Sequence, residues 1–217
     1  MTTLGNYKTD VSDMYAVHNA LTGALDAAPV YVGKADGDVQ RVEVIGSFYE
    51  NVIEFLHVHH SGEDELIYPV VEERCAESRS ELERINDQHK LLHAPMDAGR
   101  SAVAAWRVAP STATAQAVVD ALGSITEPLR PHLAEEETVL LPIASKWMSP
   151  EEFARLPAHH MMSFRADKPW LMMGLMREQL DQPHRDGMLA NMPPAMRTMW
   201  TEQMEPAFNA FVAEVRR

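Results

Sequence analysis

Apolar residues recur every three or four positions along most of the chain, and they almost never alternate with polar residues in the pattern of a β-strand. The sequence therefore predicts an all-α protein. Asp10 or Ser12 can cap a first helix that ends near Ala27, and a loop from Pro29 to Asp38 follows it. Three long helices are expected after this loop, over residues 39–75, 81–106 and 114–147.

Prolines mark the places where these long helices should bend. Pro95 is expected to kink or divide the third helix, and Pro128 and Pro131 should bend the fourth helix just before His132. The stretch Ala109-Pro110-Ser111 is typical of a turn in which Ser111 caps the fourth helix.

The last part of the chain, residues 149–217, has a different character. The stretch Ser149-Pro150-Glu151-Glu152 is a capping box with proline at the first helical position. Further helices are expected over 159–180 and 194–217, and the break between them is expected within 183–194. Ten methionines and two tryptophans in this segment indicate a helical extension that packs on the bundle or on a second subunit, which would make a homodimer. A soft-metal site of methionines is the alternative, although flexible core filling is favoured.

Two of the long helices place charged residues where core residues belong. In each of these helices, apolar residues and the charged residues between them recur at spacings of four and three, so that they share one face. These series are Val52, Leu56, His59, Glu63, Leu66, Val70 and Ile125, Leu129, His132, Glu136, Val139, Ile143. An unpaired buried carboxylate is costly, and a bound cation is the simplest partner for two of them.

The same residues belong to a motif that occurs twice: His-x-x-x-Glu with a proline ten residues after the histidine. Between the two copies lies a His-x-x-x-His pair, and a lone histidine lies on the apolar face of the first helix. Residues four apart share one side of a helix, so each pair aims two ligating groups in one direction. The candidate metal ligands are His18, His59, Glu63, His89, His93, His132 and Glu136.

Other histidines compete with this set. His60 and Asp64 form a second pair with a spacing of four, but the offset to the proline and the core spacing select His59 and Glu63 instead. His60 is expected beside the centre or at the surface, and its replacement should matter less than that of His59. His57 should point away. His159 and His160 could line an entrance, although surface or packing roles are favoured, and His184 receives no role.

The combined set, in this order on four successive helices, resembles the hemerythrin or HHE cation-binding domain over residues 10–147. The resemblance implies an up-down four-helix bundle that holds two Fe ions, with five histidines as terminal ligands, with Glu63 and Glu136 bridging the irons, and with an oxo- or hydroxo-bridge. Oxygen-carrying hemerythrins have an aspartate five residues after the last histidine, where this chain has Glu137. Glu136, at position four, fits the bacterial HHE pattern better and argues against an oxygen-carrying role.

The donor set favours iron on chemical grounds as well. Imidazoles with carboxylates suit a six-coordinate first-row metal, and the lack of a cysteine ligand weighs against structural zinc. An open position on one iron would take O2, NO or peroxide, and a protein that binds or senses such a ligand is expected. An oxidoreductase that decomposes peroxide is the alternative. Iron storage is weaker because the ferritin-like Glu-x-x-His motif occurs only once, and a helical module that binds nothing is a further alternative.

Charge and cysteine content limit the partners and the cellular compartment that are expected for the protein. The net charge of −13 argues against nucleic-acid binding or an anionic membrane surface, because both need a basic face. The single cysteine, Cys75, excludes an intramolecular disulfide and fits a reducing compartment. No signal peptide and no transmembrane segment is evident, so a cytoplasmic protein is expected.

Overall fold

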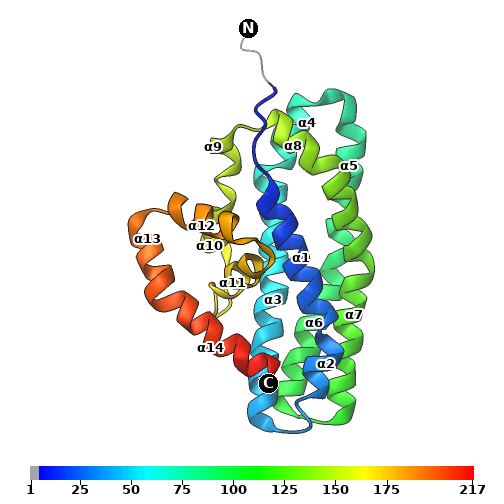
Figure 1. Ribbon diagram of the computed structural model, residues 1–217. Coiled ribbons are helices and arrows are strands. Elements are labelled where there is room, and N and C mark those ends of the chain that lie inside the picture. The colour runs from blue at the N-terminus through cyan, green and yellow to red at the C-terminus, as the bar shows by residue number, and fades with distance from the viewer. Residues whose placement is uncertain (1–4) are drawn as a thin grey trace.

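The computed structural model describes residues 5–217, and it contains helices and connecting segments but no β-strand within that range. The all-α prediction is confirmed. The first part of the chain forms a long bundle, shown in Figure 1. Its elements are α1 (Ser12–Asp26), α2 (Ala28–Gly33), α3 (Val39–Leu66), α4 (Tyr68–Arg74), α5 (Arg79–Asp87), α6 (His89–Val108), α7 (Thr112–Glu135) and α8 (Leu141–Trp147), with a 3₁₀ turn at Ala76–Ser78.

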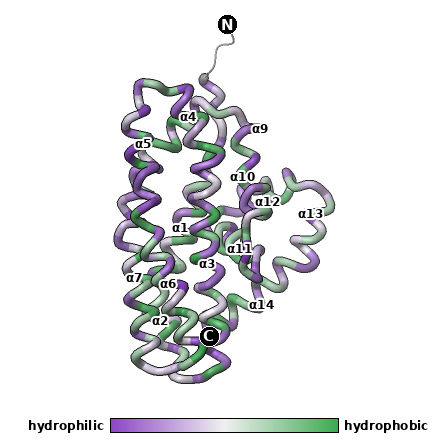
Figure 2. The backbone as a smooth tube through the Cα atoms, turned by 180° about the vertical axis from the view of Figure 1, so that it is seen from behind, coloured by the Kyte–Doolittle hydropathy of each residue, from purple (hydrophilic) through white to green (hydrophobic). Residues whose placement is uncertain are grey.

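Four long helices pack around one core. Helix α3 contacts α6, α6 contacts α7, α7 contacts α1, and α1 contacts α3, so the four close into a ring. The colours in Figure 1 show that the chain direction reverses from each of them to the next. Apolar and polar residues alternate in patches along these helices in Figure 2, as expected where one side of each helix is buried.

The two prolines of the repeated motif interrupt their helices in similar ways. Proline lacks an N–H group, and its ring clashes with the carbonyl four residues earlier. Before Pro69, α3 ends at Leu66 and the chain resumes as α4. Before Pro142, α7 widens into a π-helical turn at Glu136–Leu140, and α8 follows. Such π turns frequently occur at functional sites.

Some predicted boundaries were wrong. The expected loop contains helix α2, which starts with a proline near its N-terminus, where the missing N–H costs nothing. Pro95 does not divide its helix, because α6 continues through it and the break lies earlier, at Gln88. Ser111 caps α7 as predicted, since its hydroxyl accepts from the Thr114 amide.

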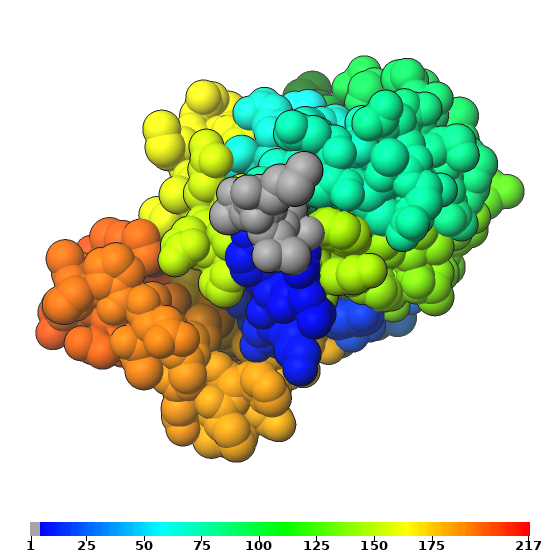
Figure 3. Space-filling model, turned by 90° about the horizontal axis from the view of Figure 1, so that it is seen from above, coloured from blue at the N-terminus to red at the C-terminus, as the bar shows by residue number. Residues whose placement is uncertain are grey.

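The extension forms a lobe beside the bundle, as seen from above in Figure 3. The capping box at Ser149 and Glu152 is present. The single helix expected over 159–180 is in fact broken, since Pro169 disfavours helix in the residue before it. The break predicted within 183–194 is present at Met192 and Pro193, and the additional helix α12 precedes it. The elements are α9 (Pro150–Phe153), α10 (Leu156–Ser163), α11 (Leu171–Gln179), α12 (Gln182–Asn191), α13 (Pro194–Met199), a π turn (Trp200–Met204) and α14 (Glu205–Arg216).

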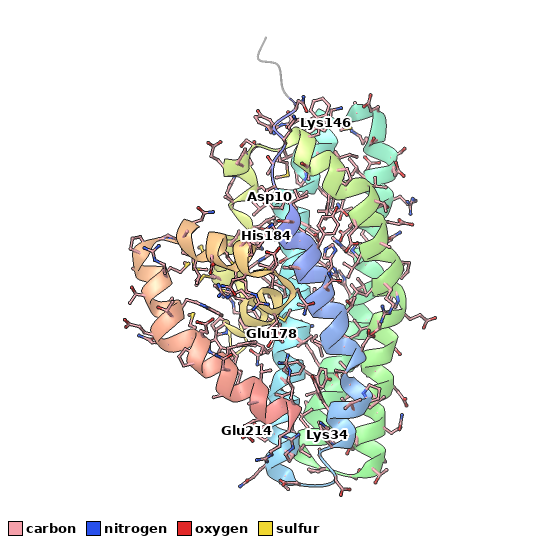
Figure 4. The ribbon with its side chains drawn as sticks, in the orientation of Figure 1. Asp10, Lys34, Lys146, Glu178, His184 and Glu214 are labelled. Atoms are coloured by element: carbon pink, nitrogen blue, oxygen red, sulfur yellow. The ribbon has the colours of Figure 1, made fainter. Side chains whose placement is uncertain are left out.

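The extension packs on the bundle of its own chain. Leu171, Met172 and Leu175 of α11 and Phe208 and Val212 of α14 belong to the same buried cluster as the bundle core. Polar contacts hold the two parts at several heights. They include Lys34 Nζ to the Arg216 carbonyl (2.8 Å) and the Asn51 amide to the Asp167 carboxylate (2.8 Å). Within the extension, Arg216 of α14 also forms an ion pair with Glu178 of α11 (2.6 Å); Lys34 and Glu178 are labelled in Figure 4.

A bidentate ion pair joins α4 to α9. The Arg74 guanidinium donates to both Glu152 oxygens at 2.8 and 2.6 Å, and it holds the pKa of Glu152 down to about 2 from 4.5. Because the folded-state pKa is lowered, the stabilisation is present above pH 4.5 and is lost as the pH falls towards 2. We expect Glu152→Ala to lower the free energy of unfolding by about 1–2 kcal/mol at pH 7.

Urea denaturation of wild type and Glu152→Ala at pH 7 and pH 3 measures this effect. The difference between the two proteins should shrink at the lower pH. Glu151→Ala, which removes an exposed neighbour on α9, is the matched control and should differ little from wild type. A difference that stays constant with pH would contradict the ion-pair explanation.

Candidate metal centre

The candidate ligands converge inside the bundle, at the level where α3 ends and α6 begins. His18 lies in the middle of α1, His59 and Glu63 lie near the end of α3, His89 begins α6, and His132 and Glu136 lie at the end of α7 and in its π turn. Their side chains are at most 3 % exposed, and Glu63 and Glu136 are completely buried. Six of the seven predicted ligands are therefore brought together from four helices.

These residues form two adjacent clusters. The first cluster holds His18, His59, Glu63 and Glu136, and its ligand atoms all lie within 4.8 Å of one another. The second cluster holds His60, His89 and His132, with its nitrogen atoms equally close. Each cluster is named after its first member, as the His18 cluster and the His60 cluster.

Both glutamates face the two clusters at once. Glu63 places Oε1 3.6 Å from His59 Nε2 and Oε2 3.6 Å from His89 Nε2. Glu136 places Oε2 3.6 Å from His18 Nε2 and Oε1 3.3 Å from His132 Nε2. Each carboxylate therefore has one oxygen for each cluster, as a bridging ligand requires.

The spacing of these atoms fits bound cations. Ligand atoms at about 2.1 Å from a shared first-row cation lie roughly 3 Å apart when they are adjacent. Buried nitrogen and oxygen atoms normally have a hydrogen-bond partner. Ten buried atoms of the two clusters have none among the described residues: His18 Nε2, His59 Nδ1 and Nε2, His60 Nδ1 and Nε2, His89 Nε2, His132 Nε2, both Glu63 oxygens and Glu136 Oε2. Cations between these atoms would give most of them a partner.

Three of the histidines have a hydrogen-bond partner at Nδ1, the ring nitrogen that faces away from the centre. His18 Nδ1 lies 3.0 Å from Glu137 Oε1, His89 Nδ1 lies 2.8 Å from Asp64 Oδ1, and His132 Nδ1 lies 3.0 Å from Gln88 Oε1. These oxygens can accept a hydrogen bond from a protonated Nδ1, which leaves the Nε2 lone pair free to face the centre. This arrangement is the usual one for metal-ligating histidines.

Charge in the site is balanced between the carboxylates and the imidazoles. Burial and the neighbouring Glu136 raise the pKa of Glu63 well above its ordinary value. Burial acts on Glu136 as well, but His132, His89 and His18 outweigh it and lower its pKa. Burial would also lower the pKa of His89, but the hydrogen bond with Asp64 and the nearby Glu136 carboxylate raise it to about 9. A cation that binds through His89 Nε2 must displace a proton from that imidazole.

His59, His60 and His132 favour the neutral form. Burial lowers the pKa of His59 and of His60 well below the ordinary value, and burial lowers the pKa of His132 to about 4. Neutral imidazole is the form that ligates metals. These three imidazoles are therefore in the form that can bind a cation at neutral pH.

The structure corrects one of the seven predicted ligands. His93 is exposed and lies outside both clusters, while His60 is only 3 % exposed and occupies the third place beside His89 and His132. The buried stripe of α6 contains His89, Leu92, Met96 and Val103, and His93 misses it. On α3, Glu63 lies between His59 and His60 around the helix axis, so all three can face inward. The apolar spacing of α6 and the position of His60 beside Glu63 on α3 could both be read from the sequence.

Tyr68 was not anticipated. Its hydroxyl donates to Glu136 Oε1 at 3.1 Å, and its side chain is 1 % exposed. Burial and the nearby carboxylates raise its pKa, so the phenol keeps its proton. It lies one residue before the proline of the first motif copy, and this position gave no sequence signal.

The two histidines of α10 differ in their surroundings. His159 lies 3.3 Å from the Ser61 hydroxyl and 3.6 Å from Glu65 at the surface. His160 packs its ring against Phe55 and His59, with centroids 5.5 and 6.2 Å away. Burial and His159 lower the pKa of His160 to about 4. His57 is exposed, as predicted, and so is His184.

Fold and site together define a helical-bundle protein with a cation-binding centre. The family model for the Hemerythrin HHE cation binding domain matches residues 9–144, which is more than half of the chain. The chain belongs to this family, and the predicted resemblance is confirmed. We found no significant match among curated proteins or among solved structures. Within residues 5–217, every helix is too short or too polar to cross a membrane.

Proposed function

We propose that this chain is a non-haem di-iron protein that binds or senses a small molecule such as O2, NO or H2O2 at an open coordination position. The unequal division of donor atoms supports this proposal most. The His18 cluster offers two imidazoles and the His60 cluster offers three, while Glu63 and Glu136 serve both. With roughly six positions on each cation, the His18 side has more room for an outside ligand.

The choice of iron rests on the type of donors. Imidazoles and carboxylates without thiolate suit a first-row metal that binds and releases small ligands. Two carboxylates shared between neighbouring cations also reduce their mutual repulsion. The irons, when bound, would supply an open position and reversible changes of oxidation state.

The protein itself controls which molecules reach this position. Leu56, Ile125 and Leu129 are fully buried beside the ligating residues, and Phe55 stacks on His59 with an interplanar angle of 9°. These apolar side chains exclude bulk water and limit access to molecules of a few atoms. A charged metabolite of larger size would have to open the bundle.

Tyr68 favours a second candidate function, the decomposition of peroxide. Cleavage of an O–O bond benefits from a group that can hand over a proton within reach of the site. The Tyr68 phenol is protonated and hydrogen-bonded to Glu136. A protein that only binds its ligand needs no such proton.

Ligand binding and peroxide turnover by the iron-loaded protein separate the two candidates. For a binder or sensor we expect saturable, reversible spectral changes with NO or azide and negligible peroxide consumption. For the oxidoreductase we expect turnover that falls about 100-fold in Tyr68→Phe while azide binding changes little. Iron-loaded protein that responds to none of these molecules would contradict both functions.

A further inference from the structure

His59 lacks the outer hydrogen-bond partner that most histidines of the centre have. Three of them have an acceptor within 3.0 Å of Nδ1. His59 Nδ1, like both nitrogens of His60, is buried and has no partner among the described residues. An imidazole that ligates through Nε2 carries its proton on Nδ1, and a buried N–H without an acceptor is destabilising. His59 is therefore expected to need an acceptor from elsewhere in the chain.

The polar side chain of His160 lies next to His59, whose Nδ1 lacks an acceptor. It lies on α10, outside the part of the chain that matches the family model. Its ring centroid is 6.2 Å from that of His59, and its Nε2 is buried without a partner among the described residues. Two unpartnered imidazole nitrogens thus occur in neighbouring rings, one from the bundle and one from the extension.

A glycine allows His160 to come this close. Phe55 and Gly62 lie on the side of α3 that flanks His59, opposite to Glu63 and His60. A Cβ atom at position 62 would lie 2.9 Å from His160 Nε2 and 3.2 Å from the Leu156 side chain. Gly62 is therefore the position that lets α10 lie against α3 beside the centre.

We propose that His160 is a positioning residue for His59: its Nε2 accepts a hydrogen bond from His59 Nδ1, directly or through one water molecule. The extension would then complete the metal centre from outside the family domain. This inference rests on the proposed metal centre. It gives His59 the kind of outer partner that Glu137, Asp64 and Gln88 give to His18, His89 and His132.

The test compares two replacements of His160 in the full-length chain. His160→Phe keeps the ring volume but removes the acceptor, and His160→Gln keeps an acceptor oxygen. Titration with Co(II) alone should show one of the two sites weakened by about 10–100-fold in His160→Phe, with the other site unchanged. His160→Gln should recover a large part of the affinity. His159→Phe, on the same helix, is the matched control and should bind like wild type.

Proton NMR of the Co(II)-loaded proteins gives a readout that packing alone would not move. Each ligating imidazole contributes one shifted, solvent-exchangeable N–H resonance. In His160→Phe one such resonance should exchange faster or disappear, while the others keep their positions. In His159→Phe all of them should persist.

The possible failures can be distinguished. Wild type that takes up no Co(II) would overturn the metal centre and this inference with it. Wild type that binds two ions, with His160→Phe unchanged or with His159→Phe equally weakened, would overturn the role of His160 alone. Loss of azide binding in His160→Phe, with both Co(II) affinities intact, would overturn it as well and would show instead that His160 contacts the outside ligand.

Discussion

Glu63→Gln and Glu136→Gln are each expected to abolish binding of the metal pair, with losses of affinity above about 100-fold. Each side chain places one oxygen toward each cluster, so one replacement removes a ligand from both cations. The neutral amide also removes negative charge from a buried site that must hold two cations. The expected loss is larger than that for an outer hydrogen-bond partner, for which about 10–100-fold is typical.

Metal content per chain after dialysis, measured by elemental analysis, checks this expectation. Glu127→Ala, an exposed position on the same helix as His132, should keep the wild-type content. Circular dichroism separates loss of metal from loss of fold, and both glutamine variants should remain helical. Two metals retained in both variants would refute the shared role of the carboxylates.

His60→Ala should lower the metal content as strongly as His59→Ala, whereas His93→Ala should leave it unchanged. His60 is buried beside His89 and His132, with ring centroids 4.3 and 5.3 Å away, and His93 is exposed. This expectation reverses the one drawn from the sequence spacing. Removing one imidazole of three should release the cation of the His60 cluster first.

The same three variants, titrated with Co(II), test the assignment directly. His57→Ala removes another exposed histidine of α3 and is the control for surface effects. A His93→Ala variant that loses metal while His60→Ala keeps it would restore the spacing argument and contradict the place of His60 in the second cluster.

Most of the centre could be predicted because its residues interrupt an otherwise apolar face. His59, Glu63, His132 and Glu136 take positions that follow the core spacing of α3 and α7, and burial forces such residues to find partners. The family resemblance supplied the order of the helices. The third imidazole was assigned wrongly, because His93 misses the buried stripe of α6 that contains His89, Leu92 and Met96.

The extension was harder to predict. Its helices are short, and prolines such as Pro169 divide them at places that hydrophobic spacing does not show. The approach of His160 to His59 depends on how α10 packs on α3, which is a tertiary contact. Tyr68 likewise reaches Glu136 through a tertiary contact, between the start of α4 and the π turn of α7.

The most direct test is iron content per chain, with the visible spectrum recorded in air and again after reduction. Our account predicts two irons per chain and an absorption band in air that is lost on reduction. Wild-type protein with one zinc, or with no metal after anaerobic purification in the presence of iron, would contradict it.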